Sequence, residues 1–239
     1  MVPGDVALNH SQLFFTRALG AKGRVLEVGC GSGQLSWRLA HLGLDVVGLD
    51  IALPAEPPSH PKLAFEKADF FQYKSLPFDA VLFTSSLHHL GPLEGAVRRA
   101  RNLLKPGGML VVDDFDLLAP DEATARWYFE MQGVLAHAGV LPVARLTGKE
   151  HERPLERWRD EHQHTPPIHS GEAMLTALTA VGALAEVTRG AYLYRALSAN
   201  LGSSARDLNV AEWLFATEER RVAAGSLKGV GLRAICKPG

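Results

Sequence analysis

The sequence has little cysteine and no long apolar run. Only two of its 239 residues are cysteines, Cys30 and Cys236, which is too few for the disulfide framework of a small secreted domain. No apolar stretch approaches the roughly 20 residues that a membrane-spanning helix needs. The first residues also lack the basic segment and apolar core of a secretory signal. We therefore expect a cytoplasmic protein with no membrane partner.

An excess of charge of either sign is also missing. Lysine and arginine number 25, aspartate and glutamate 26, and the net charge is −1. Nucleic-acid-binding domains usually concentrate basic residues on one face, so this balance argues against a nucleic-acid partner. The sequence shows no internal repeats, and its length favours one domain over residues 1–239 that carries an insertion. The composition leaves the oligomeric state open.

What the sequence does have is a strand followed by a glycine-rich turn. The run from Val25 to Gly33 reads VLEVGCGSG, and a helical pattern follows from Gln34 to about Leu42. A strand, a tight glycine turn and a helix form the nucleoside-binding corner of open α/β sheets. Glycine suits this corner because the backbone must turn sharply and let a ligand lie close.

The spacing of the glycines bears on whether the ligand is a dinucleotide. A dinucleotide-binding turn has the pattern G-x-G-x-x-G, which would require glycine at position 34 when counted from Gly29. Residue 34 is glutamine here, and the third glycine is Gly33. This spacing argues against NAD as the ligand.

Further strands follow with carboxylates at their ends. The run Asp45–Asp50 predicts a buried strand, and Asp50 lies 17 residues after Gly33, near the position of a ribose-binding acid. A carboxylate can accept hydrogen bonds from both ribose hydroxyls. Turn formation or helix capping is the alternative role of such a residue. Three more strands are predicted: one at 63–70, one over 78–90 that runs into a loop, and one at 109–113, with a helix at 93–104. Strands that alternate with helices predict a parallel sheet.

Residues 22 to 115 resemble the core of class I S-adenosylmethionine-dependent methyltransferases. The motifs that carry the resemblance are VLEVGCGSG, VVGLD, ADF, FDAVLFTSSLHHL and LLKPGGMLVV. The resemblance implies S-adenosylmethionine as cofactor. It also implies an α/β, Rossmann-like, doubly wound seven-stranded sheet, mostly parallel with an antiparallel last strand and with a helical insertion after the fifth strand.

The resemblance also implies a set of cofactor-binding residues. Asp50 would hold the ribose hydroxyls and Ile51 would touch the adenine. Asp69 would accept a hydrogen bond from the adenine amino group beside Phe70, and Ser85 would line the methionine side. The turn itself would contribute Glu27, Gly29, Cys30, Gly31 and Gly33. We interpret Cys30 as a small packing residue of this turn and not as a nucleophile.

Three residues are candidates for catalysis. His88 and His89 follow the fourth predicted strand, and Asp113 ends the fifth. Histidine titrates near neutral pH and can act as a base or as a hydrogen-bond partner. The sequence favours His88 over His89, because a residue nearer the strand end is better held. Two roles remain open for Asp113: contact with the molecule that accepts the methyl group, and turn formation.

Two segments outside the core are predicted to be helical. Residues 1–20 form an N-terminal helix, and residues 116–168 form a helical insertion. The helix that starts near Pro120 carries an aromatic cluster around Trp127. It is either a lid over the acceptor, which would serve the acceptor more than the cofactor, or a helix packed on the sheet edge. A charged run at 149–161 around Trp158 predicts a short solvated helix.

Three histidines follow within eight residues, at His162, His164 and His169. Their spacing does not place two ligands on one helical face, and we expect no metal site. Contact with the acceptor and ordinary loop packing both remain open for these histidines.

The last segment predicts a return to α/β structure. We expect a helix from Gly171 capped by Ser170, a strand at 185–194 with Tyr192 and Tyr194 on one face, and a closing strand at 229–236. Between these two strands, Asn209 and Glu212 resemble a capping box at the start of a helix.

The sequence therefore predicts an enzyme that moves a methyl group from S-adenosylmethionine to a small-molecule acceptor, at oxygen or nitrogen, by in-line displacement. One alternative is a binding protein or regulatory pseudoenzyme that keeps the cofactor site. Another is a methyltransferase that acts on protein or RNA.

Overall fold

The computed structural model describes residues 1–20, 23–141, 153–165 and 167–239. It contains two compact units. The sheet unit consists of Leu8–Asp114, His169–Thr188 and Leu232–Gly239, and the helical unit consists of Met1–Ala7, Phe115–Ile168 and Arg189–Gly231. Within the described residues, no helix combines the length and apolar character needed to cross a bilayer.

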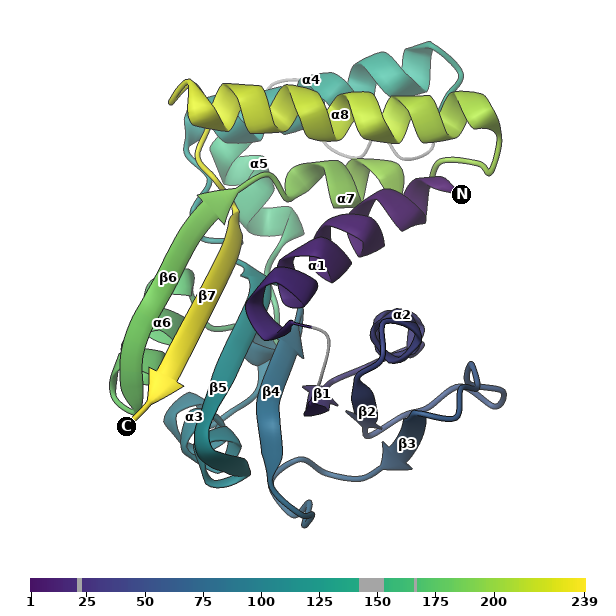
Figure 1. The fold of residues 1–239 in the computed structure, drawn as a ribbon. Coiled ribbons are helices and arrows are strands. Elements are labelled where there is room, and N and C mark those ends of the chain that lie inside the picture. The colour runs from purple at the N-terminus through teal and green to yellow at the C-terminus, as the bar shows by residue number, and fades with distance from the viewer. Residues whose placement is uncertain (21–22, 142–152, 166) are drawn as a thin grey trace. The chain divides into compact units, whose positions relative to one another are not determined.

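Seven strands, eight α-helices and one short 3-10 helix, η1 (Leu87–His89), occur in the described residues. Figure 1 shows how the strands and α-helices are arranged. The strands are β1 (Arg24–Val28), β2 (Asp45–Asp50), β3 (Leu63–Lys67), β4 (Phe78–Thr84), β5 (Leu104–Phe115), β6 (Gly182–Gly190) and β7 (Gly231–Pro238). The helices are α1 (Pro3–Leu19), α2 (Gln34–His41), α3 (Leu93–Asn102), α4 (Glu122–His137), α5 (Pro154–Glu161), α6 (Gly171–Thr179), α7 (Leu193–Ser198) and α8 (Ala205–Ala223).

All seven strands form one sheet in the order β3-β2-β1-β4-β5-β7-β6. Strands β1 to β5 pair in parallel. Strand β7 lies between β5 and β6 and runs opposite to both (Figure 1). The chain order reverses between β1 and β4, which is the switch point where open α/β sheets bind ligands beyond the carboxyl ends of the strands. The predicted seven-stranded, mostly parallel α/β fold with an antiparallel last strand is confirmed.

The sheet is covered on both faces, and the alternation of its side chains explains why. In β1, Leu26 and Val28 pack in a cluster with α3 and α6, whereas Val25 packs in a second cluster with α1 and α2. The same alternation continues in β4 and β5. Because strand side chains point to opposite faces in turn, a strand covered on both sides reads as a continuous apolar run.

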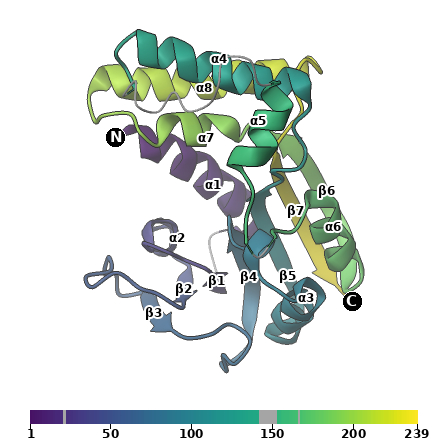
Figure 2. The ribbon, with the colours of Figure 1, turned by 180° about the vertical axis from the view of Figure 1, so that it is seen from behind.

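The helical unit has its own apolar core. Helices α4, α5, α7 and α8 contribute to it, together with Val6 from the start of α1 (Figures 1 and 2). Trp127 and Trp158 are each 2% exposed within this core. Helix α5 was expected to be solvated, and the burial of Trp158 shows that this was wrong for its apolar side. The part of the predicted helix before Arg153 lies outside the described residues.

The expected strand at 185–194 ends early, and Glu218 gives the physical reason. Strand β6 stops at Gly190, and α7 begins at Leu193. The carboxylate of Glu218, on α8, accepts hydrogen bonds from the backbone nitrogens of Tyr192, Leu193 and Tyr194 at 2.7–2.9 Å. These nitrogens lie at the start of α7, where the first backbone donors of a helix need acceptors from outside it. A carboxylate from a distant helix thus stabilises a helical turn where period-two spacing predicted a strand.

The capping box expected at Asn209 and Glu212 is also wrong. Helix α8 begins one turn earlier, where Ser204 caps the backbone nitrogen of Asp207 and the Asp207 side chain accepts from Ser204. A capping box needs only a suitable pair of residues three positions apart. Both Ser204–Asp207 and Asn209–Glu212 have this spacing, so the sequence alone does not select between them. The prediction for Ser170 is confirmed, since its hydroxyl accepts from the backbone nitrogen of Ala173 at the start of α6.

Candidate active site

The glycine turn after β1 leaves open space above its backbone. Gly29 has a φ of 74°, and a Cβ added there would lie 2.7 Å from Cβ of Ser86. Gly31 has a φ of 53°, and an added Cβ would meet no atom within 4 Å. Gly29 is therefore required by close packing. At Gly31 the backbone conformation favours glycine, and a ligand can approach the turn from the open side.

Asp50 joins the end of β2 to this turn. Its Oδ2 accepts a hydrogen bond from the backbone nitrogen of Gly31 at 2.8 Å, and its Oδ1 accepts from the backbone nitrogen of Ala52 at 3.0 Å. A carboxylate offers about four acceptor positions, so two remain after these bonds. The neighbouring Ile51 is 71% exposed. An apolar side chain beside a fixed carboxylate suits a ligand with a flat ring and hydroxyl groups.

These residues line a cavity of about 350 Å³ in the sheet unit. Its size is in the range of pockets that bind small organic ligands. The predicted site residues that line it are Gly29, Asp50, Ile51, Asp69, Phe70, Ser85 and His89. Glu27, Cys30, Gly31, Gly33, His88 and Asp113 are not among its lining residues. Sequence reasoning missed Leu49, Ala68, Phe71 and Leu90, which line it too but read as ordinary apolar positions.

The turn after β3 forms one side of the cavity. Strand β3 ends at Lys67, so Asp69 lies in the turn and not in the strand, and its Oδ1 accepts from the backbone nitrogen of Phe71 at 2.8 Å. Phe70 is 4% exposed and meets Phe83 of β4 edge to face, with ring centres 6.1 Å apart. The packed ring fixes the turn, and the turn holds the Asp69 carboxylate at the cavity.

The loop after β4 also lines the cavity. Ser85 has a φ of 49°, which is uncommon for a residue other than glycine, and its backbone nitrogen donates to the carbonyl of Asp113 at 2.9 Å. The hydroxyl of Ser86 donates to the carbonyl of Val28 at 2.6 Å. Two hydrogen bonds therefore tie this loop to the ends of β1 and β5, as a preorganised binding site requires.

Glu27 lies beneath the turn, on the face of the sheet that α2 covers. It is 2% exposed and accepts a hydrogen bond from the hydroxyl of Ser36. Burial raises the pKa of Glu27 to about 7, against its ordinary value of 4.5. The Cys30 thiol is also buried, and burial raises its pKa to about 12. A thiol of this pKa stays protonated near neutral pH and is a poor nucleophile.

The two adjacent histidines have different surroundings. His88 is 2% exposed, and its Nδ1 lies 2.7 Å from Oδ1 of Asp114, itself fully buried. Its carbonyl accepts from the backbone nitrogen of His169 at 2.9 Å. His89 is exposed and lines the cavity. The structure thus holds His88 in a buried pair with Asp114, whereas His89 is the histidine that a ligand in the cavity can reach.

Asp113 is engaged on both carboxylate oxygens. Its Oδ2 accepts from the hydroxyl of Ser11 at 2.5 Å, and its Oδ1 accepts from Nε of Arg233 at 3.0 Å. The side chain is 2% exposed. This carboxylate therefore links α1 and β7 to the end of β5 and holds these three elements together.

A second cavity, of about 480 Å³, lies in the helical unit. Trp158, His162 and His164 line it, whereas His169 belongs to the sheet unit, where its Nε2 lies 3.1 Å from the carbonyl of Leu90. The three clustered histidines of the sequence therefore divide between the two units. Among the residues that the structure describes, no group of three His, Cys, Asp or Glu side chains is arranged to hold a metal ion.

A known protein family matches most of the chain. The sequence matches a family model described as a methyltransferase domain over residues 4–183. Because this match covers most of the chain, the chain belongs to that family, the class I S-adenosylmethionine-dependent methyltransferases. S-adenosylmethionine is the cofactor of this family.

Two curated relatives illustrate the similarity. The chain is 32% identical over 117 residues to the 27-O-demethylrifamycin SV methyltransferase of Amycolatopsis mediterranei, covering 44% of this chain and 43% of that protein. It is 31% identical over 178 residues to the malonyl-[acyl-carrier protein] O-methyltransferase of Magnetococcus marinus, covering 67% and 62%. The matches thus span less than two thirds of either relative.

A solved structure shares the fold across nearly the whole chain. It is the 1,6-didemethyltoxoflavin-N1-methyltransferase of Burkholderia thailandensis, with bound 1,6-didemethyltoxoflavin and S-adenosylhomocysteine. The TM-score is 0.54 at 14% identity, and the match covers 97% of this chain and 78% of that one. At this identity the likeness speaks for the fold alone.

Proposed function

We propose that the cavity of the sheet unit binds S-adenosylmethionine and that the protein transfers the methyl group to a small-molecule acceptor. The observation that carries the proposal is the Asp50 carboxylate, held by the backbone nitrogens of Gly31 and Ala52 at the mouth of the glycine turn. Its remaining acceptor positions suit the two ribose hydroxyls of the cofactor.

The other lining residues fit the rest of the cofactor. In this proposal the exposed Ile51 packs on the adenine, and Asp69 accepts from the adenine amino group beside Phe70. Gly29 and Ser85 face the methionine part, and the open space at Gly31 admits the ligand close to the backbone. The cavity volume of about 350 Å³ supports this assignment.

S-adenosylmethionine supplies an activated methyl group, so the protein has to orient the acceptor and, where needed, accept its proton. His89 is the cavity-lining side chain suited to accept a proton. His88, paired with Asp114 behind it, holds the loop on which His89 lies. We therefore assign proton transfer to His89 and a positioning role to His88.

The acceptor atom is proposed to be oxygen or nitrogen. The names of the two curated relatives specify oxygen as the methylated atom, which supports the oxygen part of this proposal.

Calorimetry with S-adenosylhomocysteine and with NAD tests the cofactor part of the proposal. We expect S-adenosylhomocysteine to bind and NAD to bind poorly, because the third glycine is at position 33 and not at 34. Tight NAD binding without S-adenosylhomocysteine binding would overturn it. Transfer of label from S-adenosylmethionine to pools of small hydroxyl and amine compounds tests the reaction. Cofactor binding with no transfer to any pool would favour a regulatory binding protein.

A further inference from the structure

One residue, His169, bonds to the carbonyl groups of the two residues that flank His89. The backbone nitrogen of His169 donates to the carbonyl of His88 at 2.9 Å, and Nε2 of its ring lies 3.1 Å from the carbonyl of Leu90. His89 and Leu90 both line the cavity proposed for the cofactor. All four residues belong to the sheet unit, so this arrangement is defined within one unit.

The contact with Leu90 determines which ring nitrogen of His169 carries a proton. A carbonyl oxygen can only accept a hydrogen bond, so Nε2 has to be the donor. In the neutral ring the proton is therefore on Nε2, and in the charged ring both nitrogens are protonated. The bond to Leu90 forms in either state, and it does not depend on the charge of His169.

Helix α6 gives His169 a fixed position. The hydroxyl of Ser170 accepts from the backbone nitrogen of Ala173, and the carbonyl of Ser170 accepts from that of Met174 at 3.0 Å. The helix thus begins directly after His169. Met174 and Leu178 are each 0% exposed in the core of the sheet unit. Because the core holds the helix and the cap holds its first turn, the residue before the cap has little freedom to move.

The loop that His169 contacts consists of a single turn, η1, over Leu87–His89. Helices of the 3-10 type have poorer hydrogen-bond geometry than α-helices, so bonds from outside the turn contribute to its order. Asp114 at the end of β5 accepts from the backbone nitrogen of His88 at 3.3 Å. His169 at the start of α6 bonds to the carbonyls of His88 and Leu90. The turn is therefore bonded to two elements that are themselves fixed in the sheet unit.

We propose that His169 is a positioning residue of the cofactor cavity, because its two donors hold the loop that carries His89 and Leu90 in the conformation that the ligand meets. The inference rests on the proposed function for the identity of the ligand. His169 acts on that ligand through the loop. A site whose walls are ordered in advance loses less free energy when a ligand binds. Loss of the bond to Leu90 should therefore weaken ligand binding.

Three substitutions of His169 separate this hydrogen bond from the rest of the side chain. His169→Gln places an amide nitrogen at about the reach of Nε2 and keeps the donor. His169→Asn carries the same amide on a shorter side chain, which does not reach the carbonyl of Leu90. His169→Leu has no donor. All three variants keep the backbone nitrogen that bonds to His88.

Calorimetry with S-adenosylhomocysteine on the full chain measures the effect. We expect His169→Asn and His169→Leu to bind it about 3- to 10-fold more weakly, the range of one neutral hydrogen bond. His169→Gln should stay within about twofold of the unaltered protein, because the donor is restored. Rescue by glutamine but not by asparagine is the result that a role in packing alone does not produce.

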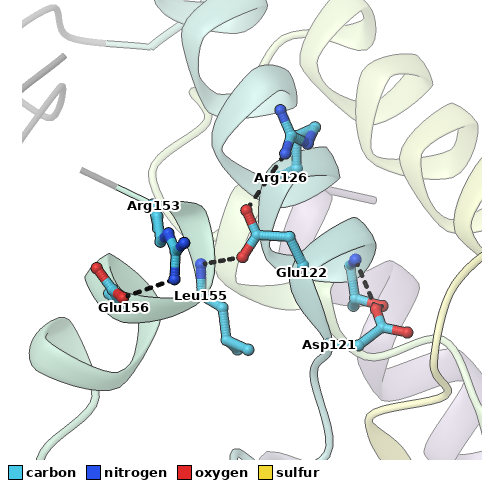
Figure 3. Close-up of polar contacts among 7 residues, drawn as sticks. Asp121, Glu122, Arg126, Arg153, Leu155 and Glu156 are labelled. Atoms are coloured by element: carbon cyan, nitrogen blue, oxygen red, sulfur yellow. Dashed lines mark hydrogen bonds and ion pairs between the residues drawn. The ribbon is translucent and has the colours of Figure 1, made fainter. Parts of the chain in front are cut away.

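Two control variants test whether the effect belongs to this position. Nδ1 of His41, on α2, lies 2.9 Å from the carbonyl of Trp37, so His41→Leu also removes a histidine contact with a backbone carbonyl in the sheet unit. In the helical unit, Figure 3 shows the carboxylate of Glu122, on α4, accepting from the backbone nitrogen of Leu155 in α5, at 3.2 Å. Glu122→Ala removes this tie between two elements. Both controls should leave the affinity for S-adenosylhomocysteine unchanged.

Nitrogen NMR of the unaltered protein examines the bond directly, since the neutral ring of His169 should carry its proton on Nε2. Three results would overturn the inference: a proton on Nδ1, affinities of His169→Asn and His169→Leu equal to that of the unaltered protein, or equal weakening by glutamine and asparagine. Absence of S-adenosylhomocysteine binding in the unaltered protein, with the proton on Nε2, would instead count against the proposed function.

Discussion

Oδ2 of Asp50 lies 2.8 Å from the backbone nitrogen of Gly31, so the carboxylate at the end of β2 is bonded to the glycine turn after β1. The bond fixes the acidic side chain before any ligand arrives. A group that is already oriented loses little side-chain entropy on binding. Asp50 is for this reason the residue on which we expect cofactor affinity to depend most.

The first prediction concerns this carboxylate. Asp50→Ala should weaken S-adenosylhomocysteine binding by about 10- to 150-fold, because hydrogen bonds to a charged group contribute roughly 1.5–3 kcal/mol. Asp50→Asn should lose less, since one acceptor oxygen remains. Calorimetry measures both. Asp45→Ala, at the exposed start of the same strand, is the control and should bind normally. Affinity of Asp50→Ala within twofold of the unaltered protein would mean that the ribose is held elsewhere.

The second prediction is a pH dependence of stability due to Glu27. Its pKa rises from 4.5 to about 7 on folding, so between these values the folded protein holds a proton that the unfolded chain has released. The contribution of Glu27 to stability is therefore lost as pH rises through this window, by about 3 kcal/mol in total. Glu27→Gln cannot ionise and should avoid this loss.

Urea denaturation of both proteins, at about pH 5 and about pH 8, measures this effect. The stability of Glu27→Gln relative to the unaltered protein should increase with pH. Ser36→Ala is a useful companion, because it removes the hydroxyl that bonds to Glu27 without removing the carboxyl group. A stability difference between Glu27→Gln and the unaltered protein that stays constant with pH would show that Glu27 ionises normally.

The third prediction concerns Trp127, which lies in the segment that the sequence predicts to be either a lid over the acceptor or a packed helix. The side chain is 2% exposed in the core of the helical unit. Trp127→Ala should therefore lower the free energy of unfolding by about 3–5 kcal/mol, the usual cost of removing a large buried aromatic ring. Trp213→Ala, at a position 53% exposed on α8, should change it by less than about 1 kcal/mol. Chemical denaturation compares them, and near-equal stabilities would contradict the burial of Trp127.

The fourth prediction separates the adjacent histidines. His88→Ala leaves the buried Asp114 carboxylate without this partner and should lower the free energy of unfolding by about 3 kcal/mol. His89→Ala should leave stability nearly unchanged and slow methyl transfer by about 100-fold or more, the usual contribution of a proton-transfer group. Denaturation and single-turnover rates measure the two effects. Normal turnover by His89→Ala would exclude it as the proton acceptor.

The fold could be predicted to the extent that its signals are local. The glycine turn, the apolar strands and the residues that follow them specify β1, β2, β4 and β5 and their order along the chain, because a strand covered on both faces must be apolar throughout. Ser170 as a cap could be predicted for the same reason, since it bonds to a nitrogen three residues away. The strand expected at Tyr192 and Tyr194 could not be corrected from sequence, because Glu218 is more than 20 residues distant.

The sequence by itself determined the class of protein and most of the residues that line the cavity proposed for the cofactor. Strand-end residues such as Asp50 and Ser85 are brought together by parallel pairing alone, which places all carboxyl ends at one edge. Only the tertiary structure decided which side chains near that edge are available to a ligand. His88 is buried beside Asp114 and does not line the cavity. Asp113 already accepts hydrogen bonds from Ser11 and Arg233. These partners come from distant segments, and no local pattern encodes them.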